Sequence, residues 1–403
     1  MTDRSILLVA SNFPPVRGGS AVVYGNLARH LCDRITVLAS WENYIDGLPL
    51  IGWREHDRGA PYRVVRLRLL RTRITSGREG RLTGLLHLAT DLLIRLRVAA
   101  VLVYLLLTTG ARTVCVGEVL AGSWILQLCQ WLPQVRGVVY VHGEEVTTET
   151  TYDPGLHRTL VSLRAADRIV VVSRFTRDTI RVLLGPTATA KTVLIANGLD
   201  TRHFRPLGKR PDLVALYQLQ DRFVFVSVCR LVEKKGIDNT IRAFAAVQRH
   251  YPDCRYLVVG NGPYEAALRR LAAEAGVADS VIFAGDVAEA DLVAHYCLGD
   301  VFVMPNRALA DGDTEGFGLV FLEANGCGLP VIAGRDGGSL DAVQDGVNGL
   351  VVDGHSMTAI EAAMLVLISD VALRGRLARQ GQEAAAAADW HGRAAAFLAA
   401  CGS

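Results

Sequence analysis

Short apolar runs alternate with longer stretches of mixed polarity along the whole chain. The runs are rich in valine, isoleucine, leucine and phenylalanine, as in "SILLVA" (5–10) and "FVFVSV" (223–228). Strands of a parallel sheet have this pattern because helices cover both faces of the sheet. We predict strands at 5–10, 35–40, 63–67, 112–117, 137–142, 168–173 and 192–196, and then at 223–228, 255–260, 280–285, 300–305, 330–334 and 349–353.

The stretches between these runs have the period of amphipathic helices, as in "SAVVYGNLARHL" and "PYEAALRRLAAEAG". Strand and helix alternate through two successive series, which predicts an α/β chain of two doubly wound domains. Polar residues and prolines collect in "GLDTRHFRPLGKRPD", so we place the boundary there, with domains at 1–205 and 206–385. Ligands of such sheets bind at the carboxyl ends of the strands, which predicts a cleft between the two domains.

Composition agrees with a folded chain of two or three domains. The chain has 403 residues, and half of them are hydrophobic, which argues against disorder. The eight cysteines are scattered, with no Cys-x-x-Cys pair and no His/Cys cluster of metal-binding spacing. We therefore expect free thiols in a reducing compartment. The N-terminus enters a strand directly, without the pattern of a signal peptide.

Charge is unevenly distributed between the two halves. Residues 1–205 carry 26 basic and 16 acidic side chains (+10), and residues 206–403 carry 17 and 24 (−7), which sum to +3. Seven arginines lie between Arg63 and Arg81. The apolar stretch 82–111 follows, but its longest uncharged run, Val98 to Ala111, has 14 residues, fewer than the roughly 20 that span a bilayer. Two interpretations stay open: a buried helix, or arginines and helix resting on an anionic membrane surface.

Two pairs of glycines precede predicted helices. Gly18 and Gly19 follow the first strand, and Ser20 is a plausible N-cap for the helix after them. Gly260 and Gly262 follow the strand 255–260. Glycines at such positions let backbone amides approach an anion at a helix N-terminus. A plain strand-to-helix turn is the alternative for the first pair, and the second pair is not a complete G-x-G-x-x-G motif.

Two cations follow the strand 223–228, in "VCRLVEKKGID". Arg230 and Lys235 lie just beyond the strand and before a helix, where they could hold a diphosphate. The alternative is a solvated charge cluster in which Glu233 pairs with Lys234 or Lys235.

Two carboxylates flank the start of a predicted helix in "EGFGLVFLEANGCGLPVIA". We interpret Glu315 to Gly318 as a loop and Leu319 as the first residue of the helix, with Glu323 inside it. The amides of Phe317 to Leu319 would then be the unpaired donors of the first turn. Carboxylates accept from hydroxyls, and free amides bind phosphate, so this arrangement suits a nucleotide sugar.

With these motifs, the chain resembles the family 4 ("group 1") retaining glycosyltransferases of the GT-B fold. The resemblance rests on the two glutamates, the Arg/Lys pair, the Gly-Gly loop and "VHGEE", and it covers essentially the whole chain. "NGLD" (197–200) and "GGSLDAVQDGVNGLVVD" (337–353) also resemble family landmarks, although Leu340-Asp341 stands where the family usually has Pro-Glu. "DWHGRAA" resembles the closing segment, which implies that 386–403 is a helix returning to the N-terminal domain.

The resemblance implies a reaction: a hexosyl group passes from a nucleoside diphosphate to an acceptor hydroxyl with retained anomeric configuration. The donor would be GDP-mannose or a UDP-hexose, and the acceptor a lipid-linked or polysaccharide intermediate of the cell envelope. It also implies catalytic roles for Glu315, His142, Arg230 and Lys235. The donor-binding set that it implies is Gly18, Gly19, Arg230, Lys235, Gly260, Gly262, Glu315, Gly316, Phe317, Gly318, Leu319 and Glu323.

Within this set, Glu315 would hold hexose hydroxyls, Glu323 the ribose and His142 the sugar 6-hydroxyl. No metal or other cofactor is expected, because cations and amides stabilise the leaving diphosphate. We expect no nucleic-acid partner and a cytoplasmic enzyme at the inner face of the plasma membrane.

Three alternatives remain open at this stage. Asp311 and Asp313 form an Asp-x-Asp pattern that binds a divalent metal in another glycosyltransferase fold. A nucleotide-sugar 2-epimerase shares the two-domain architecture but needs no acceptor. A catalytically silent sugar-nucleotide binding protein would keep the site without turnover.

Overall fold

The computed structural model describes residues 5–73, 81–148 and 153–402. The chain divides into two compact units. Unit 1 comprises Met1–Val172, Thr176–Ile195 and Trp390–Ser403, and unit 2 comprises Ser173–Phe175 and Ala196–Asp389. The chain thus leaves unit 1 after Ile195, ten residues before the boundary we predicted, and it returns to unit 1 at Trp390.

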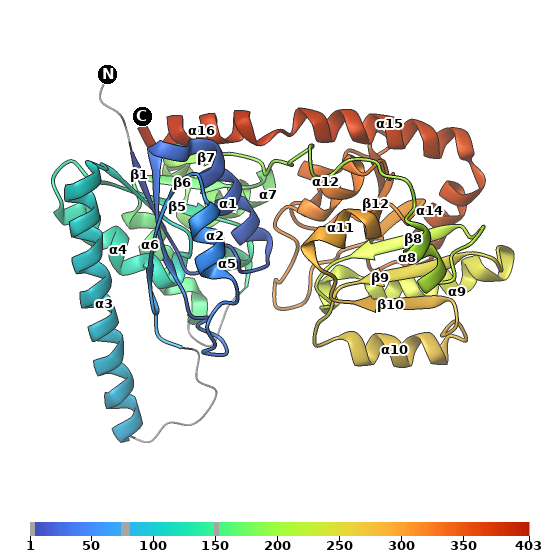
Figure 1. Cartoon of the computed structure of the whole chain (residues 1–403), viewed down its shortest axis with the longest axis horizontal. Coiled ribbons are helices and arrows are strands. Elements are labelled where there is room, and N and C mark those ends of the chain that lie inside the picture. Colours follow the sequence, from blue (N-terminus) through green and yellow to red (C-terminus); the bar gives the residue numbers. More distant parts are fainter. Residues whose placement is uncertain (1–4, 74–80, 149–152, 403) are drawn as a thin grey trace. The chain divides into compact units, whose positions relative to one another are not determined.

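Unit 1 is built on a seven-stranded parallel sheet in the order β3-β2-β1-β4-β5-β6-β7. Its central strands are almost completely buried, because helices lie on both faces (Figure 1). The strands are β1 (Ile6–Ala10), β2 (Ile35–Ser40), β3 (Arg63–Leu67), β4 (Thr113–Val116), β5 (Arg136–Val141), β6 (Arg168–Val171) and β7 (Thr192–Leu194). The helices are α1 (Gly19–Leu31), α2 (Trp53–Gly59), α3 (Arg81–Thr109), α4 (Val119–Trp131), α5 (Glu144–Thr147), α6 (His157–Ala165), α7 (Arg174–Leu184) and α16 (Trp390–Gly402).

Unit 2 contains a six-stranded parallel sheet in the order β10-β9-β8-β11-β12-β13. Its strands are β8 (Val224–Val228), β9 (Arg255–Val259), β10 (Val281–Gly285), β11 (Val301–Met304), β12 (Val331–Gly334) and β13 (Gly349–Val352). Its helices are α8 (Pro211–Leu216), α9 (Ile237–His250), α10 (Glu265–Glu274), α11 (Glu289–Tyr296), α12 (Leu319–Gly326), α13 (Ser339–Ala342), α14 (Met357–Ser369) and α15 (Val371–Ala387).

All thirteen predicted strands are present in the structure, with ends that differ by at most two residues. The prediction of two doubly wound α/β sheets is therefore confirmed. In each sheet the strand order reverses at one point, between β1 and β4 in unit 1 and between β8 and β11 in unit 2. Loops at the carboxyl ends of these strands diverge and leave room for a ligand.

The C-terminal helix α16 packs within unit 1. The ring of Phe397 lies 5.8 Å from the ring of Tyr140 in β5, and the Thr113 hydroxyl donates to the carbonyl oxygen of Cys401. Trp390 and Phe397 are completely buried. The end of the chain thus supplies part of the core that holds the first sheet together.

The predicted N-cap at Ser20 is wrong, because the helix and its cap begin two residues earlier. Gly18 occupies the cap position with φ of 150°, and Gly19 is the first helical residue. No side chain caps this helix end. Both glycines are exposed, so the amides at the start of α1 face solvent.

Helix α3 is not the buried helix that was one of our two interpretations. Val98, Leu102 and Leu105 in its C-terminal half are completely buried in the core of unit 1, but several leucines between Leu85 and Leu107 are exposed. The segment Leu85–Thr109 is also long and apolar enough to cross a membrane by length and composition. Our sequence analysis counted only the longest uncharged run and did not predict this apolar length. The few charged residues within Leu85–Thr109 do not make the helix polar as a whole.

Several arginines of the run Arg63 to Arg81 form ion pairs with acidic side chains of the protein itself. The Arg66 side chain is 2% exposed and pairs with Asp57 at 2.7 Å, while Arg68 and Arg73 both pair with Glu42. Arg66 is therefore not available to a lipid headgroup, which removes it from the membrane interpretation of Arg63 to Arg81. Arg78 lies outside the described residues.

Candidate functional site

The loop before α12 presents free backbone amides, as its sequence predicted. Gly318, with φ of 85°, caps the helix, and the amides of Gly316, Gly318 and Leu319 have no hydrogen-bond partner among the described residues. The amide of Phe317 is different, because it hydrogen-bonds to Glu315 and helps to lower the pKa of that carboxyl. Phe317 was therefore wrongly counted among the free donors, and three neighbouring amides remain for an anion.

Lys235 and Glu315 form a hydrogen-bonded ion pair beside these amides. The Nζ of Lys235 donates to Oε2 of Glu315, and both side chains are largely buried, with 14% and 13% exposed. Burial alone would raise the pKa of Glu315, but the charge and hydrogen bond of Lys235 outweigh it and hold the pKa below its ordinary value. Both groups are therefore charged at neutral pH, in a place where water screens them little.

Lys234 and Glu233, which precede Lys235 in the chain, have partners other than each other and Lys235. Lys234 donates to Asp313, and Glu233 accepts from the buried Arg307 at 3.2 Å. The alternative in which Glu233 neutralises Lys234 or Lys235 is therefore wrong. Arg230 is exposed, and its guanidinium has no ion-pair partner within the part of the chain that the structure describes.

Gly260 and Gly262 allow two loops to meet at the end of β8. A Cβ on Gly260 would lie 2.0 Å from the carbonyl oxygen of Cys229, and one on Gly262 would lie 2.3 Å from that of Leu231. The amide of Leu231 donates to the carbonyl of Asn261 at 2.8 Å. These glycines thus have a clear packing role, since they hold the backbone on either side of Arg230.

A second Gly-Gly pair, which the sequence reasoning did not place in the site, supports the Glu315 loop. A Cβ on Gly338 would lie 1.9 Å from the carbonyl oxygen of Gly316, and one on Gly337 would lie 2.2 Å from that of Glu315. The amide of Gly338 donates to the carbonyl of Glu315 at 2.7 Å. The position of Gly337 and Gly338, just after a central strand, was the signal that could have identified them.

Leu340 and Asp341, which stand where the family usually has Pro-Glu, lie in the same segment. The Asp341 carboxylate accepts from the backbone amide and the guanidinium of Arg174, each at 3.0 Å. The acidic side chain therefore holds the backbone of Arg174, which belongs to the same unit as Asp341.

Glu323 projects from the second turn of α12. Its Oε2 accepts from the hydroxyl of Tyr296 at 2.6 Å. Burial raises the pKa of Glu323 to about 7, although the Tyr296 hydrogen bond partly opposes this shift. A ligand that donates hydroxyl hydrogens to Glu323 would stabilise its ionised form.

In unit 1, a carboxylate that sequence reasoning missed holds the loop after β1. Oε2 and Oε1 of Glu118 accept from the amides of Ser11 and Asn12 at 2.9 and 2.8 Å. Glu118 follows β4, the neighbour of β1 at the point where the strand order reverses. It therefore fixes the start of the loop that leads to Gly18 and Gly19.

His142, at the end of β5, is held by Tyr24 of α1. Its Nε2 lies 2.7 Å from the Tyr24 hydroxyl, and that hydroxyl donates its hydrogen to the carbonyl of Gly117 at 2.6 Å. Nε2 must then carry the hydrogen, which leaves Nδ1 as an acceptor. Burial lowers the pKa of His142 to about 4, so the ring is neutral at physiological pH.

The two aspartates of the Asp-x-Asp pattern are occupied by other groups. Asp313 accepts from Lys234, and Asp311 accepts from the amide of Asp313 at 3.0 Å. Among the described residues, no group of three or more His, Cys, Asp or Glu side chains could hold a metal ion. The pattern thus offers few ligand atoms to a metal ion, and one of its carboxylates, that of Asp313, is paired with Lys234.

Comparisons with known proteins agree with this geometry. The family model "Glycosyl transferases group 1" matches residues 214–384, which contain Arg230, Lys235, Glu315 and Glu323. The chain is 35% identical over 376 residues to the GDP-mannose-dependent alpha-(1-6)-phosphatidylinositol monomannoside mannosyltransferase of Mycolicibacterium smegmatis. The alignment covers 91% of this chain and 89% of that protein.

Solved structures show the same fold at lower identity. The sucrose-phosphate synthase of Thermosynechococcus elongatus superposes with a TM-score of 0.75 and 22% identity, covering 98% of this chain and 97% of that one. Anabaena HepE, solved in complex with UDP and glucose, superposes with a TM-score of 0.72 and 19% identity, covering 98% of each chain. From the sequence relationship, the matching fold and the family model, the chain belongs to the group 1 (family 4) glycosyltransferases of the GT-B fold and is a hexosyltransferase that uses a nucleotide sugar.

Proposed function

We propose that the enzyme transfers mannose from GDP-mannose to a lipid-linked acceptor of the phosphatidylinositol mannoside type, with retention of the anomeric configuration. The observation that carries the proposal is the buried Lys235–Glu315 pair next to three free amides. A cation from the loop after β8 thus lies beside a carboxylate and anion-binding amides from the loop before α12. The choice of donor and acceptor is supported by the activity for which the M. smegmatis relative is named.

The diphosphate of the donor would lie on the cationic side of this loop. Lys235 and Arg230 supply positive charge, and the amides of Gly316, Gly318 and Leu319 point at phosphate oxygens from the start of α12. Arg230 is well suited to the role because its guanidinium is exposed.

The sugars of the donor would lie on the carboxylates. Glu315 accepts hydrogen bonds from hexose hydroxyls when Lys235 turns to the diphosphate. Both members of the ion pair then have the donor as their partner. Glu323 accepts from the ribose hydroxyls. In unit 1, His142 accepts from a hydroxyl of the hexose through Nδ1, since its Nε2–H is directed at Tyr24.

In the reaction, the bond between the anomeric carbon and the leaving phosphate oxygen breaks, and a bond to the acceptor oxygen forms on the same face. The acceptor hydroxyl gives its proton to the leaving diphosphate. Negative charge on that diphosphate grows during the step, so Lys235, Arg230 and the free amides stabilise the transition state more than the ground state. These groups replace a metal ion, and we propose that the enzyme needs none.

A transfer assay tests the proposal. Purified enzyme is incubated with radiolabelled GDP-mannose and phosphatidylinositol monomannoside in detergent, and the lipid product is separated and its anomeric linkage determined. We expect labelled lipid with an α-linkage and none from UDP-glucose. Conversion of the donor without acceptor to a 2-epimer would support the epimerase alternative. Nucleotide binding without any turnover would support the silent binding protein.

A further inference from the structure

Helix α3 exposes an apolar face that runs along its whole described length. Leu85, Leu92, Leu96, Val103 and Leu107 follow one another at spacings of 7, 4, 7 and 4 residues, which places them on one side of a helix. Their side chains are 37–79% exposed, and further exposed apolar residues flank this row: Leu86, Leu88, Leu93 and Tyr104. The row is about 33 Å long at 1.5 Å per residue. We call these nine residues the α3 stripe.

The opposite side of α3 is anchored in the core. Val98, Leu102 and Leu105 are completely buried against the sheet and its helices. For α3 to span a bilayer, these three side chains would have to leave that core and uncover the apolar groups against which they pack. Helix α3 therefore stays on unit 1, and only the stripe can meet a partner. Figure 1 shows α3 at one edge of unit 1, with its N-terminal half extending past the sheet.

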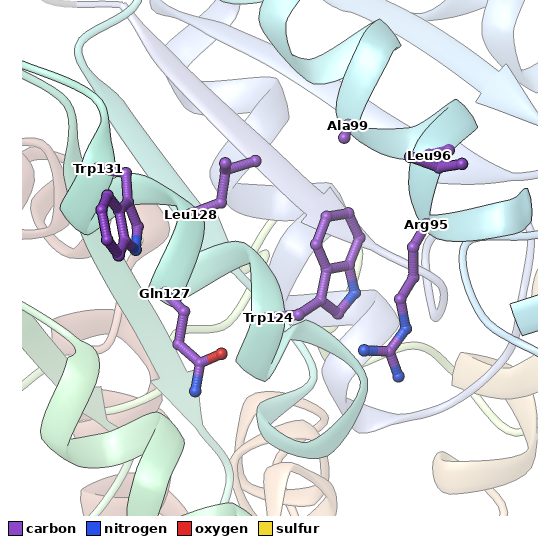
Figure 2. A pocket seen from close by; sticks show the side chains of 7 residues that line it. All are labelled: Arg95, Leu96, Ala99, Trp124, Gln127, Leu128 and Trp131. Atoms are coloured by element: carbon purple, nitrogen blue, oxygen red, sulfur yellow. The ribbon is translucent and has the colours of Figure 1, made fainter. Parts of the chain in front are cut away.

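An open apolar depression continues the stripe onto α4. Its volume is about 320 Å³, and it is lined by Leu96, Ala99, Trp124, Leu128 and Trp131, with Arg95 and Gln127 at its edge. Figure 2 shows Trp124 between α3 and α4 and Trp131 at the end of α4. Trp131 is 84% exposed. Tryptophan beside exposed leucines is typical of the interface between acyl chains and headgroups.

Basic side chains border the stripe on both sides. Arg95 and Arg97 lie on opposite flanks of the leucine row by their helical positions, and both are exposed. Arg95 also pairs with Asp91 at 2.7 Å. Long basic side chains can place their charges among phosphates while the apolar face enters the acyl region.

We propose that the α3 stripe and Trp131 form a membrane anchor that lies in the surface of an anionic phospholipid bilayer. The exposed leucines enter the acyl boundary, Trp131 lies at headgroup level, and Arg95 and Arg97 contact lipid phosphates. This inference deepens the proposed use of a lipid-linked acceptor and rests on it for its purpose. It differs from an electrostatic attachment through Arg63 to Arg81, because the main driving force is burial of apolar surface.

Vesicle flotation tests the anchor directly. Wild-type protein is mixed with vesicles of 70% phosphatidylcholine and 30% phosphatidylglycerol at low and high salt. We expect binding that weakens with salt but persists, since apolar burial is not screened. In a variant carrying Leu85→Gln, Leu92→Gln and Leu96→Gln, we expect at least tenfold weaker binding. The matched control is Leu216→Gln with Val371→Gln, two residues of unit 2 that are 66% and 67% exposed, which should bind as wild type.

Tryptophan fluorescence supplies a second measurement. Vesicles should shift the emission of the wild-type protein to shorter wavelength, and Trp131→Phe should remove most of that shift. GDP-induced thermal stabilisation is measured for every variant and should be unchanged, which separates failure of the anchor from failure of the proposed function.

Two results would overturn the anchor. One is equal flotation of wild type and the triple leucine variant. The other is a wild-type dimer that does not float and becomes monomeric in that variant, because the stripe would then be an interface between two copies of this chain.

Discussion

The hydroxyl of Tyr24 lies 2.7 Å from Nε2 of His142 and donates its own hydrogen to the carbonyl of Gly117. Tyr24 comes from the first helix and His142 from the end of the fifth strand, 118 residues later. The tyrosine thereby determines which nitrogen of the histidine accepts. We assign it as a positioning residue.

Replacing Tyr24 with Phe should lower kcat at least fivefold and change KM little. His142 then loses the group that orients its ring, and two buried polar atoms lose a partner, at a cost of roughly 1–3 kcal/mol of folding stability. Steady-state kinetics and thermal unfolding measure the two effects separately. The matched control is Tyr217→Phe, which removes a similar contact to His295 at 3.1 Å in unit 2. If both variants lose stability and neither loses kcat, Tyr24 is only structural.

Glu315→Gln should cut turnover at least tenfold while the fold stays intact. The amide keeps the shape of the side chain but removes negative charge near the anomeric carbon, where positive charge develops. It also leaves Lys235 without its counter-ion, so a moderate loss of stability is expected. Asp313→Asn is the control, since it breaks the neighbouring ion pair with Lys234. Wild-type turnover in the purified, folded Glu315→Gln variant would refute the assignment.

GDP should bind more tightly as pH rises through 7. The pKa of Glu323 is raised to about 7 in the free enzyme, and ribose hydroxyls favour its carboxylate form, so binding at lower pH must release a proton. We expect about tenfold weaker affinity at pH 6 than at pH 8, measured by calorimetry. Glu323→Gln should make the affinity independent of pH in this range, and a flat profile in the wild type would contradict the ribose role.

The same shift has the opposite effect on the stability of the free protein. The folded pKa of about 7 lies above the ordinary value of 4.5, so the folded state binds more protons between these values. The contribution of Glu323 to stability is therefore complete below pH 4.5 and is lost as pH rises through 7.

Activity should survive EDTA. Lys235, Arg230 and the free amides already neutralise the diphosphate in our proposal, and Asp313 is paired with Lys234. The transfer assay is run after dialysis against EDTA and again with added manganese or magnesium. Complete loss of activity that either metal restores would make Asp311 and Asp313 candidate ligands again.

Gly338→Ala should weaken GDP binding at least tenfold. Its Cβ would lie 1.9 Å from the carbonyl oxygen of Gly316, so the loop that carries Glu315 and the free amides must shift. Gly375→Ala in α15 is the matched control, because its nearest neighbour would be the end of the Arg379 side chain at 3.7 Å. That variant should bind GDP normally and gain up to about 1 kcal/mol of stability. Equal binding by both variants would show that the Gly337-Gly338 loop does not position the site.

The order of strands and helices could be predicted from the sequence because buried parallel strands and amphipathic helices have different local periods. The loop at Glu315 and the helix starting at Leu319 were predicted for the same reason, since glycines and an apolar run mark a helix start. The residue types at the strand ends also indicated phosphate and sugar chemistry. These features depend on residues that are near one another in the chain.

Only the tertiary structure decided which of these groups meet. Lys235 could have paired with Glu233, two residues away, but the sheet brings it to Glu315, 80 residues later. Arg66 looked like a surface charge, and its partner Asp57 became evident only when β3 and α2 were packed together. The sequence left open whether the leucines of α3 are core residues, because an apolar pattern does not say whether a helix face is covered by the protein or left open to a partner. Burial and pairing depend on contacts between distant segments, which a local pattern does not record.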